Sequence, residues 1–378
     1  MLLAQFTVTV ARPMTSYRLL ELGNSAADIG WVSVLYALVP LVLFLPASGW
    51  AAGRGLVLLG LGSCALVVAG CTGLAVGEDL LSLTIANILL GAGNSGQLLT
   101  YQSVIARESG GRHYDRDYGW MAVGASLGQL VGPIAGTFTF EHYGGGLSGT
   151  TASMSIAVAA ALAGVAATAS LLHHPQVYGR STDERPPKIQ HRLHSTLSRP
   201  GAKASMYVSL VVTSTIDLWT VYLPVLGEER GWTPRLVGIL LALRAAASLL
   251  ARLALGVSLV HVTRRQILTA SVGLAAITVS LVPFLGSAGL LMVAVSLLGL
   301  GLGIGQPVTL AWSVSVVRPE EQSTSIAIRL MGNRVGQVVL PALAAFVVGL
   351  GGGAAVVFWL LGSLLASSAG AAVKGHNA

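Results

Sequence analysis

Charged residues are scarce in this sequence, and their scarcity excludes a soluble fold. Asp, Glu, Lys and Arg make up only 10% of the 378 residues, whereas soluble domains carry about 25%. Cysteine is also rare: Cys64 and Cys71 are the only two, and their spacing places them about 10 Å apart along a helix. A disulfide cannot bridge that distance, so no disulfide scaffold is expected and the cysteines do not indicate a compartment.

Nucleotide-binding and metal-binding patterns are missing as well. The glycines at positions 299, 301, 303 and 305 lie inside an apolar run, follow no strand and lack the Lys-Ser/Thr pair that holds phosphates. The histidines of the polar stretch 173–204 show no paired ligand spacing. We therefore expect no ATP hydrolysis, no metal, no cofactor and no enzymatic activity.

Hydrophobic residues take the place of the missing charges. They make up 53% of the chain, and about 20 consecutive apolar residues cross the ~30 Å hydrocarbon core of a membrane. We predict an all-α integral membrane protein in the lipid bilayer. About twelve transmembrane helices are expected, near 1–17, 27–46, 55–77, 80–105, 118–140, 151–172, 205–226, 235–258, 265–285, 288–316, 323–349 and 353–373.

The few charges sort between alternate loops. Basic residues gather in the loop 107–116, in the stretch 173–204 and at 264–265, while acidic residues gather in the other loops, for example at 78–79. Lys and Arg are enriched in cytoplasmic loops. We therefore predict that both termini are cytoplasmic and that the net charge of +7 reflects this bias, without a nucleic-acid partner.

The sequence repeats itself at an offset of 208 residues. The segment GQLVGP at 128–133 reappears as GQVVLP at 336–341, and LLGAGNSGQ at 89–97 resembles LLGLGLGIGQ at 297–306 with one insertion. The chain is therefore predicted to hold two similar six-helix bundles of the same orientation, at 1–172 and 205–378, with a cytoplasmic linker at 173–204 between them. Two such repeats around a central path are typical of transporters.

A glycine-rich face marks the predicted fifth helix. Gly124, Gly128, Gly132 and Gly136 recur every fourth residue, with Pro133 beside the third. Such spacing clears one face for a neighbouring helix, and proline bends a helix. The pattern resembles the glycine-proline motif of proton-coupled efflux members of the major facilitator superfamily. The resemblance covers the whole chain and implies alternating access. Close packing alone is the other interpretation of these glycines.

A second family signature is only partly kept. The superfamily's loop pattern after its second helix matches Gly53 and Arg54, and the equivalent second-half loop keeps Gly256, Arg264 and Arg265. Both loops lack the acidic residue of the family pattern. The resemblance therefore implies the family's fold but leaves its usual gating latch incomplete.

One acid and one base are predicted at similar depth in adjacent helices. Asp217 lies about 12 residues into the seventh helix and Arg244 about nine into the eighth, which places both 13–14 Å from the outer face. A buried charge is costly, so each requires a reason. Asp217 is a candidate proton-coupling residue whose protonation responds to Arg244. A permanent ion pair that only holds the helices is the alternative.

Two arginines lie in the eleventh helix. Arg334, with Asn333 beside it, is about 18 Å from the cytoplasmic end, whereas Arg329 is shallower; we expect Arg329 to snorkel to the interface. The family resemblance implies that Arg244 and Arg334 face the path. Two guanidiniums against one acid suit an anionic substrate, unless backbone carbonyls at broken helices satisfy them.

Other polar and aromatic residues are candidates for the substrate cavity. Amides in the fourth and tenth helices can bind substrate or only hold helices together, about 0.6 kcal/mol each. An arginine near the outer end of the first helix can bind substrate or snorkel. The residues concerned are Asn94, Gln97, Gln306, Trp219, Tyr222 and Arg12.

These observations lead to a secondary active transporter of a small-molecule substrate, monomeric, in the bacterial inner membrane. The leading hypothesis is proton-coupled export of a small apolar or amphipathic molecule, and the alternative is proton-coupled uptake of an organic anion. A receptor or assembly protein on the same scaffold is a third possibility. The buried charges are not repeated: by the offset of 208, Asp217, Arg244 and Arg334 correspond to Thr9, Tyr36 and Ser126.

Overall fold

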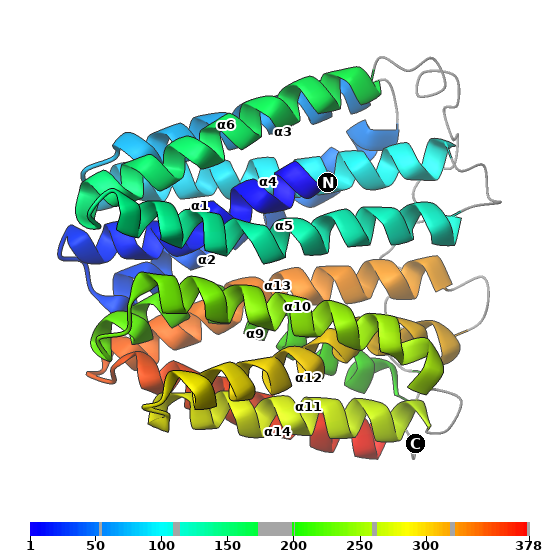
Figure 1. The fold of residues 1–378 in the computed structure, drawn as a ribbon. Coiled ribbons are helices and arrows are strands. Elements are labelled where there is room, and N and C mark those ends of the chain that lie inside the picture. Colours follow the sequence, from blue (N-terminus) through cyan, green and yellow to red (C-terminus); the bar gives the residue numbers. More distant parts are fainter. Residues whose placement is uncertain are drawn as a thin grey trace. The chain divides into compact units, whose positions relative to one another are not determined.

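The computed structural model describes residues 1–52, 55–108, 114–172, 199, 201–258, 263–317 and 322–375, and within them it is helical. These residues form twelve long α-helices, which are labelled in Figure 1. They are α1 (Leu2–Glu21), α2 (Ala26–Ala52), α3 (Leu56–Val76), α4 (Leu80–Glu108), α5 (Tyr114–His142), α6 (Gly146–Leu172), α9 (Ala202–Glu229), α10 (Pro234–Ser258), α11 (Arg264–Leu281), α12 (Ala288–Ser315), α13 (Gln322–Gly349) and α14 (Ala354–Gly375). A 3-10 turn, η1 (Val282–Phe284), follows α11. All twelve predicted apolar runs coincide with a helix.

Nine of the described helices are long and apolar enough to cross a membrane. A shorter apolar stretch, Ala26–Val42, lies in α2. α1 and α4 are not among these nine helices, because polar residues interrupt their apolar runs. The structure thus supports a multi-pass membrane protein, while the number of twelve spans and the cytoplasmic termini stay predictions.

The chain divides into two compact units. The first comprises Met1–Arg185 with Trp232–Ala242, and the second Pro186–Gly231 with Leu243–Ala378. α1–α6 and the start of α10 therefore belong to the first unit. The boundaries predicted from the repeat stay a prediction, and the predicted linker lies outside the described residues except for residues 199 and 201–204.

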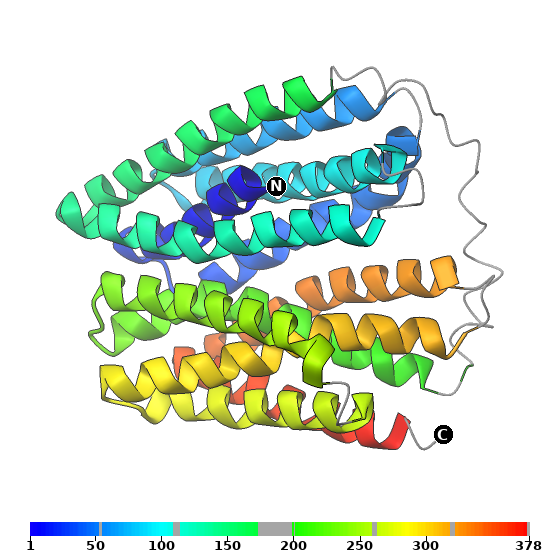
Figure 2. The same ribbon diagram turned by 45° about the vertical axis from the view of Figure 1, so that its right-hand side comes forward.

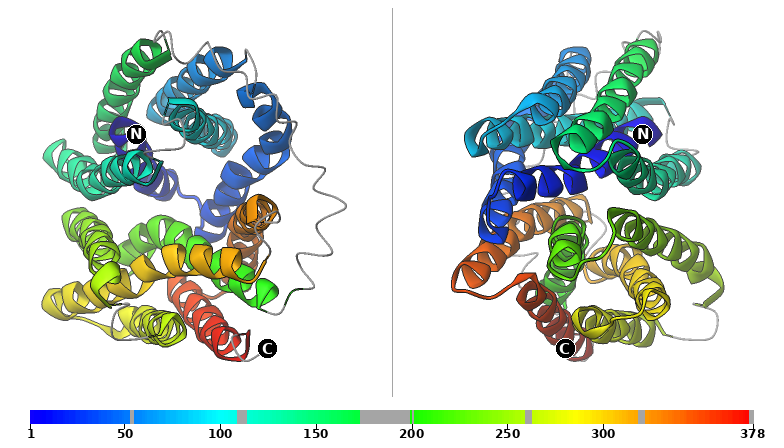
Figure 3. Two further views of the ribbon diagram at one scale, coloured as in Figure 1. Left: turned by 90° about the vertical axis from the view of Figure 1, so that its right-hand side faces the viewer. Right: turned by 60° about the vertical axis from the view of Figure 1, so that its left-hand side comes forward.

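Both units use the same set of helix contacts. In the first, α1 packs against α5 and α6, and α3 packs against α4 and α6. In the second, α9 packs against α13 and α14, and α11 packs against α12 and α14. These helices run beside their partners along their lengths in views from several sides (Figure 2, Figure 3). The order of contacts is what a duplicated six-helix unit requires.

Glycines show the repeat at atomic scale. A Cβ on Gly91 of α4 would collide with the carbonyl oxygen of Tyr36, and a Cβ on Gly299 of α12 would lie 2.5 Å from that of Arg244. Both members of these pairs are related by the offset of 208. Only glycine permits such an approach between helices. The same backbone contact therefore holds α2 to α4 and α10 to α12.

Side-chain caps set several helix starts. The Asp79 carboxylate accepts the backbone N–H of Ser82 at 2.8 Å in the first turn of α4, and this hydrogen bond lowers the pKa of Asp79. Thr263 and Gln266 form a capping box at the start of α11. Such caps satisfy N–H groups that have no partner within the helix.

Candidate functional site

A chain of three polar side chains joins α9 to α13 in the second unit. Gln337 donates from Nε2 to the Asp217 carboxylate at 2.5 Å, and Arg334 donates from Nη1 to Oε1 of Gln337 at 3.1 Å. All three side chains are half-buried in the middle of their helices. The amide of Gln337 thus connects the buried acid to a guanidinium. Gln337 was not among the sequence candidates, although it lies in the repeated segment at 336–341.

Arg244 of α10 is a buried charge in the same unit. Its side chain is only 6% exposed, and its Nε has no hydrogen-bond partner among the described residues. It lies within electrostatic reach of Asp217 and of Arg252. Asp217 and Arg244 thus lie within electrostatic reach of each other, while their depth in the membrane stays a prediction. Their roles stay a prediction.

Two further arginines donate to oxygen atoms of α12 near Pro307. α12 continues through this proline, which has no N–H to donate to the carbonyl of Gly303. Arg252 donates from Nε to that carbonyl at 3.4 Å. One turn along α12, Arg329 donates from Nη2 to the carbonyl and the side-chain oxygen of Gln306, at 3.0 and 2.9 Å. α12 thus offers oxygen acceptors to two arginines from α10 and α13.

The prediction that Arg329 snorkels to the interface is wrong. Its side chain is 4% exposed and also donates to Thr309 at 3.1 Å. The acceptors on α12 hold it inside the unit, and depth along α13 alone did not reveal them. Both ends of the Gln306 side-chain amide are therefore hydrogen-bonded. Its oxygen accepts from Arg329, and its nitrogen donates to the hydroxyl of Thr213.

Three other candidates of the second unit lie in its interior. Asn333 accepts a hydrogen bond from Ser209 at 2.8 Å and is 6% exposed. Trp219 and Tyr222 are fully buried, and the Trp219 ring meets Phe358 edge-on with centroids 5.5 Å apart. Packing is therefore the observed environment of these residues. Their predicted place in a substrate cavity stays a prediction.

The first unit brings two of its candidates together around an aromatic ring. The guanidinium of Arg12 in α1 lies 4.6 Å from the ring centroid of Tyr36 in α2. Asn94 of α4 donates to the Tyr36 hydroxyl at 3.0 Å. Gln97, one turn further along α4, is buried and instead donates to the Cys64 thiol at 3.2 Å. Sequence reasoning did not select Tyr36, although the offset aligns it with Arg244.

The glycine face of α5 packs on α1. A Cβ on Gly128 would lie 2.6 Å from the carbonyl oxygen of Leu2, and one on Gly136 would lie 3.3 Å from Val10. Thr9 also donates to the carbonyl of Gly128 at 3.0 Å. Gly124 and Gly132 meet the same helix. The packing role of the motif, with Pro133 inside α5, is therefore observed, and its gating role stays a prediction.

The loop-motif candidates are only partly visible. Gly53 and Arg54 lie outside the described residues. Gly256 belongs to the end of α10, and Arg264 and Arg265 begin α11 directly after its cap. No role for these residues follows from their position.

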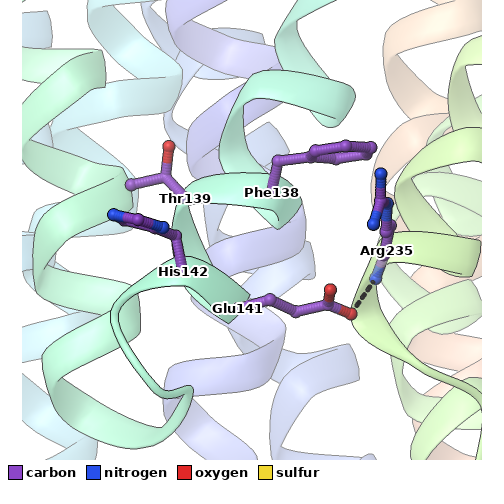
Figure 4. A pocket seen from close by; sticks show the side chains of 5 residues that line it. All are labelled: Phe138, Thr139, Glu141, His142 and Arg235. Atoms are coloured by element: carbon purple, nitrogen blue, oxygen red, sulfur yellow. Dashed lines mark hydrogen bonds between the residues drawn. The ribbon is translucent and has the colours of Figure 1, made fainter.

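A cavity of 640 Å³ lies at helix ends of the first unit (Figure 4). The end of α5 and the start of α10 line it, both within the first unit. Glu141 accepts the backbone N–H of Arg235 at 2.7 Å, while the Arg235 guanidinium stacks 4.1 Å from the Phe138 ring centroid. A carboxylate there stabilises the start of α10, because a helix N-terminus favours negative charge.

Two six-helix repeats with charges held inside the helices define the class of polytopic transport proteins. The chain belongs to the Major Facilitator Superfamily, whose sequence profile matches residues 1–233 and 205–373. It is similar in structure to a point mutant of the nucleoside transporter NupG, solved as a crystal structure, with a TM-score of 0.81 and 14% identity over 99% of this chain and 97% of that one.

A POT family transporter in complex with a thioalcohol-conjugated peptide is also similar, with a TM-score of 0.76 and 13% identity over 97% of this chain and 92% of that one. At such identities the likeness shows the fold and no substrate. No curated protein matches the sequence. Membership in the superfamily indicates transport as the function of the chain and gives no sign of catalysis.

Proposed function

We propose that this protein is a proton-driven secondary transporter that exports a small amphipathic molecule by alternating access. The observation that carries the proposal is the half-buried acid Asp217, which accepts a 2.5 Å hydrogen bond from Gln337 and lies within electrostatic reach of Arg244. A carboxylate that can be either neutral or charged in such surroundings is suited to taking up and releasing a proton.

Protonation of Asp217 would change two contacts together. A neutral carboxyl attracts Arg244 less and is a poorer acceptor for the Gln337 amide. Gln337 also holds Arg334 through its oxygen, so the change reaches a second guanidinium on α13. The proton thereby alters how α9 is held against α13 and α10, which is the kind of bias that alternating access requires.

The export direction rests on the glycine-proline face of α5, which resembles that of efflux members. The loop charges support cytoplasmic termini, and we propose a monomer in a bacterial inner membrane. The partners in this proposal are lipid, protons and a small molecule.

Uptake of an organic anion with protons is the second candidate. Arg244, Arg252, Arg329 and Arg334 all lie well inside helices of the second unit, where Asp217 is the only described acid away from a helix end. This excess of guanidinium groups favours an anionic partner, and the unpartnered Nε of Arg244 is a donor that an anion would satisfy. If Arg334→Gln leaves anion transport intact, this candidate fails.

Proteoliposomes with an imposed pH gradient provide the test. Proton flux through the reconstituted protein is followed with a panel of amphipathic solutes, for wild type and Asp217→Asn. We expect solute-dependent proton movement to disappear in Asp217→Asn, since an amide cannot be protonated in this range. Asp28→Asn is the matched control, because Asp28 only caps α2 through Ser25. Unchanged proton movement in Asp217→Asn would refute the coupling role.

A further inference from the structure

Three helices of the first unit converge on the ring of Tyr36. Arg12 covers it at 4.6 Å from the centroid, and Asn94 fixes its hydroxyl at 3.0 Å. All three side chains are half-buried, so part of each remains reachable. The aromatic ring is thus oriented both by its face and by its hydroxyl, as a recognition surface requires.

The backbone around Tyr36 is held as firmly as its ring. α4 approaches α2 most closely where Gly91 meets the Tyr36 carbonyl, since a Cβ at that glycine would collide with it. Asn94 lies three residues beyond Gly91, on the same face of α4. The glycine contact therefore places Asn94 within hydrogen-bonding distance of the Tyr36 hydroxyl.

The depth of Arg12 sets the direction of its side chain. Arg12 lies nine residues before Glu21, the last residue of α1, which is about 13–14 Å along the helix. A charged side chain inside a membrane helix is costly, and such residues face a protein interior or an aqueous cavity. Arg12 accordingly faces Tyr36 within the first unit, and both side chains are half-buried.

We propose that the Arg12–Tyr36–Asn94 cluster is a cargo subsite that recognises a flat aromatic acid. The ring of the cargo packs on the guanidinium–phenol stack, and its carboxylate accepts hydrogen bonds from the in-plane N–H groups of Arg12. A guanidinium can do both, because stacking uses its faces and pairing with a carboxylate uses its edges. This inference rests on the proposed transport function and names its substrate class.

The repeat assigns this selectivity to the first unit. By the offset of 208, Thr220 takes the place of Arg12 and Arg244 takes that of Tyr36. The second unit thus keeps a cation at the equivalent site but has no aromatic platform beneath it. Both units offer a cation that can bind an anionic group. Only Tyr36 of the first unit offers an aromatic ring on which a flat cargo can stack.

Equilibrium binding to the full-length protein in nanodiscs tests the proposal without any gradient. The probes are 2-naphthoate, its saturated analogue decahydro-2-naphthoate and 2-naphthylmethylamine, measured by titration calorimetry. We expect 2-naphthoate to bind about tenfold more tightly than the saturated acid, as one stacking contact provides, and the amine not to bind. Equal affinities of the two acids, or no binding of 2-naphthoate, would overturn the proposal.

Variants separate recognition from folding. Tyr36→Leu should abolish the preference for the flat acid while leaving the saturated acid's affinity within about twofold, because only the stack is lost. Tyr36→Phe keeps the ring and should keep the preference. Arg12→Lys keeps the charge but not the plane, and should bind both acids alike. If Tyr36→Leu weakens both acids equally, Tyr36 is only structural. A protein that binds 2-naphthoate but moves no protons would refute the proposed transport mechanism and leave this subsite standing.

Discussion

Arg18 of α1 and Arg244 of α10 are buried to nearly the same extent, 3% and 6% exposed, yet they are satisfied very differently. Arg18 donates to the carbonyl of Gly77 at 2.8 Å and to the hydroxyls of Thr150 and Thr151 at 3.0 and 2.9 Å. The Nε of Arg244 has no partner in the part of the chain that the structure describes. Buried charges that serve only the fold are hydrogen-bonded.

The position of each arginine along its helix reinforces this contrast. Arg18 lies in the last turn of α1 and joins α1 to the end of α3 and the start of α6. Arg244 lies in the middle of α10, within electrostatic reach of Arg252 and Asp217. By the repeat they correspond to Leu226 and Tyr36, so neither was duplicated. The contrast supports a structural role for Arg18 and agrees with the proposed functional role of Arg244.

Replacement of each arginine by methionine should separate the two roles, and the effect on transport is the largest that we expect. Arg244→Met should abolish coupled transport and leave thermal stability equal or higher, because it removes a buried donor without a partner. Arg18→Met should lower stability by about 3 kcal/mol, since it leaves buried acceptors unpaired. Thermal unfolding in detergent and proteoliposome flux are the measurements.

Arg18→Lys provides the control for charge alone. It keeps the positive charge but cannot reach the same three acceptors with a planar group, so it should recover only part of the stability. If Arg244→Met destabilises the protein as strongly as Arg18→Met does, Arg244 is a structural residue and the contrast is lost.

The repeated glycine contacts offer a smaller and more balanced comparison. Gly91→Val and Gly299→Val should each cost about 1–3 kcal/mol of stability by overpacking, because both glycines touch a carbonyl of the neighbouring helix. Gly299→Val should in addition disturb proton-coupled flux, since the carbonyl belongs to Arg244. Gly91→Val should instead weaken binding of 2-naphthoate, since its contact is with Tyr36.

Glycines with open surroundings are the matched controls for this pair. A Cβ on Gly62 of α3 or on Gly273 of α11 would meet nothing within 4 Å. Alanine at either position should therefore change neither proton-coupled flux nor the binding of 2-naphthoate. Identical effects of Gly91→Val and Gly299→Val on flux and on binding would show that the two units do not divide these tasks.

Much of this architecture was predictable from the sequence. The apolar runs predicted all twelve helices because a membrane demands long segments with internally satisfied backbones. The offset of 208 paired glycines whose contacts the structure confirms, such as Gly299 with its counterpart Gly91. The helical rise alone predicted that Asp217 and Arg244 lie at similar depth, and the two residues are within electrostatic reach of each other.

The partners within the site were less accessible to sequence reasoning. Helix rotation decides which side chains meet, and apolar runs without clear amphipathicity do not fix it. The donor Gln337 and the ring of Tyr36 were therefore missed, and Arg329 was wrongly expected at the interface. The carbonyl freed by Pro307 could be predicted, but the arginine that reaches it, Arg252, comes from another helix.

The smallest expected effect concerns a carboxylate at equivalent positions in both units. Glu229 accepts the N–H of Ala354, the first residue of α14, at 2.8 and 3.0 Å with its two oxygens. Glu21 corresponds to Glu229, and Gly146, the first residue of α6, corresponds to Ala354. Among the described residues no hydrogen bond joins Glu21 to α6, although a Cβ on Gly146 would lie 3.9 Å from its Oε2.

Glu229→Ala should therefore lower stability by about 1 kcal/mol, the usual value of a helix cap with a favourable charge, and Glu21→Ala should lower it less. Thermal unfolding in detergent measures both, and Glu228→Ala controls for loss of a neighbouring exposed charge. Equal losses at Glu21 and Glu229 would mean that Glu21 closes onto α6 in solution. The capping contact would then belong to the duplicated scaffold, and the buried charges alone would distinguish the two units.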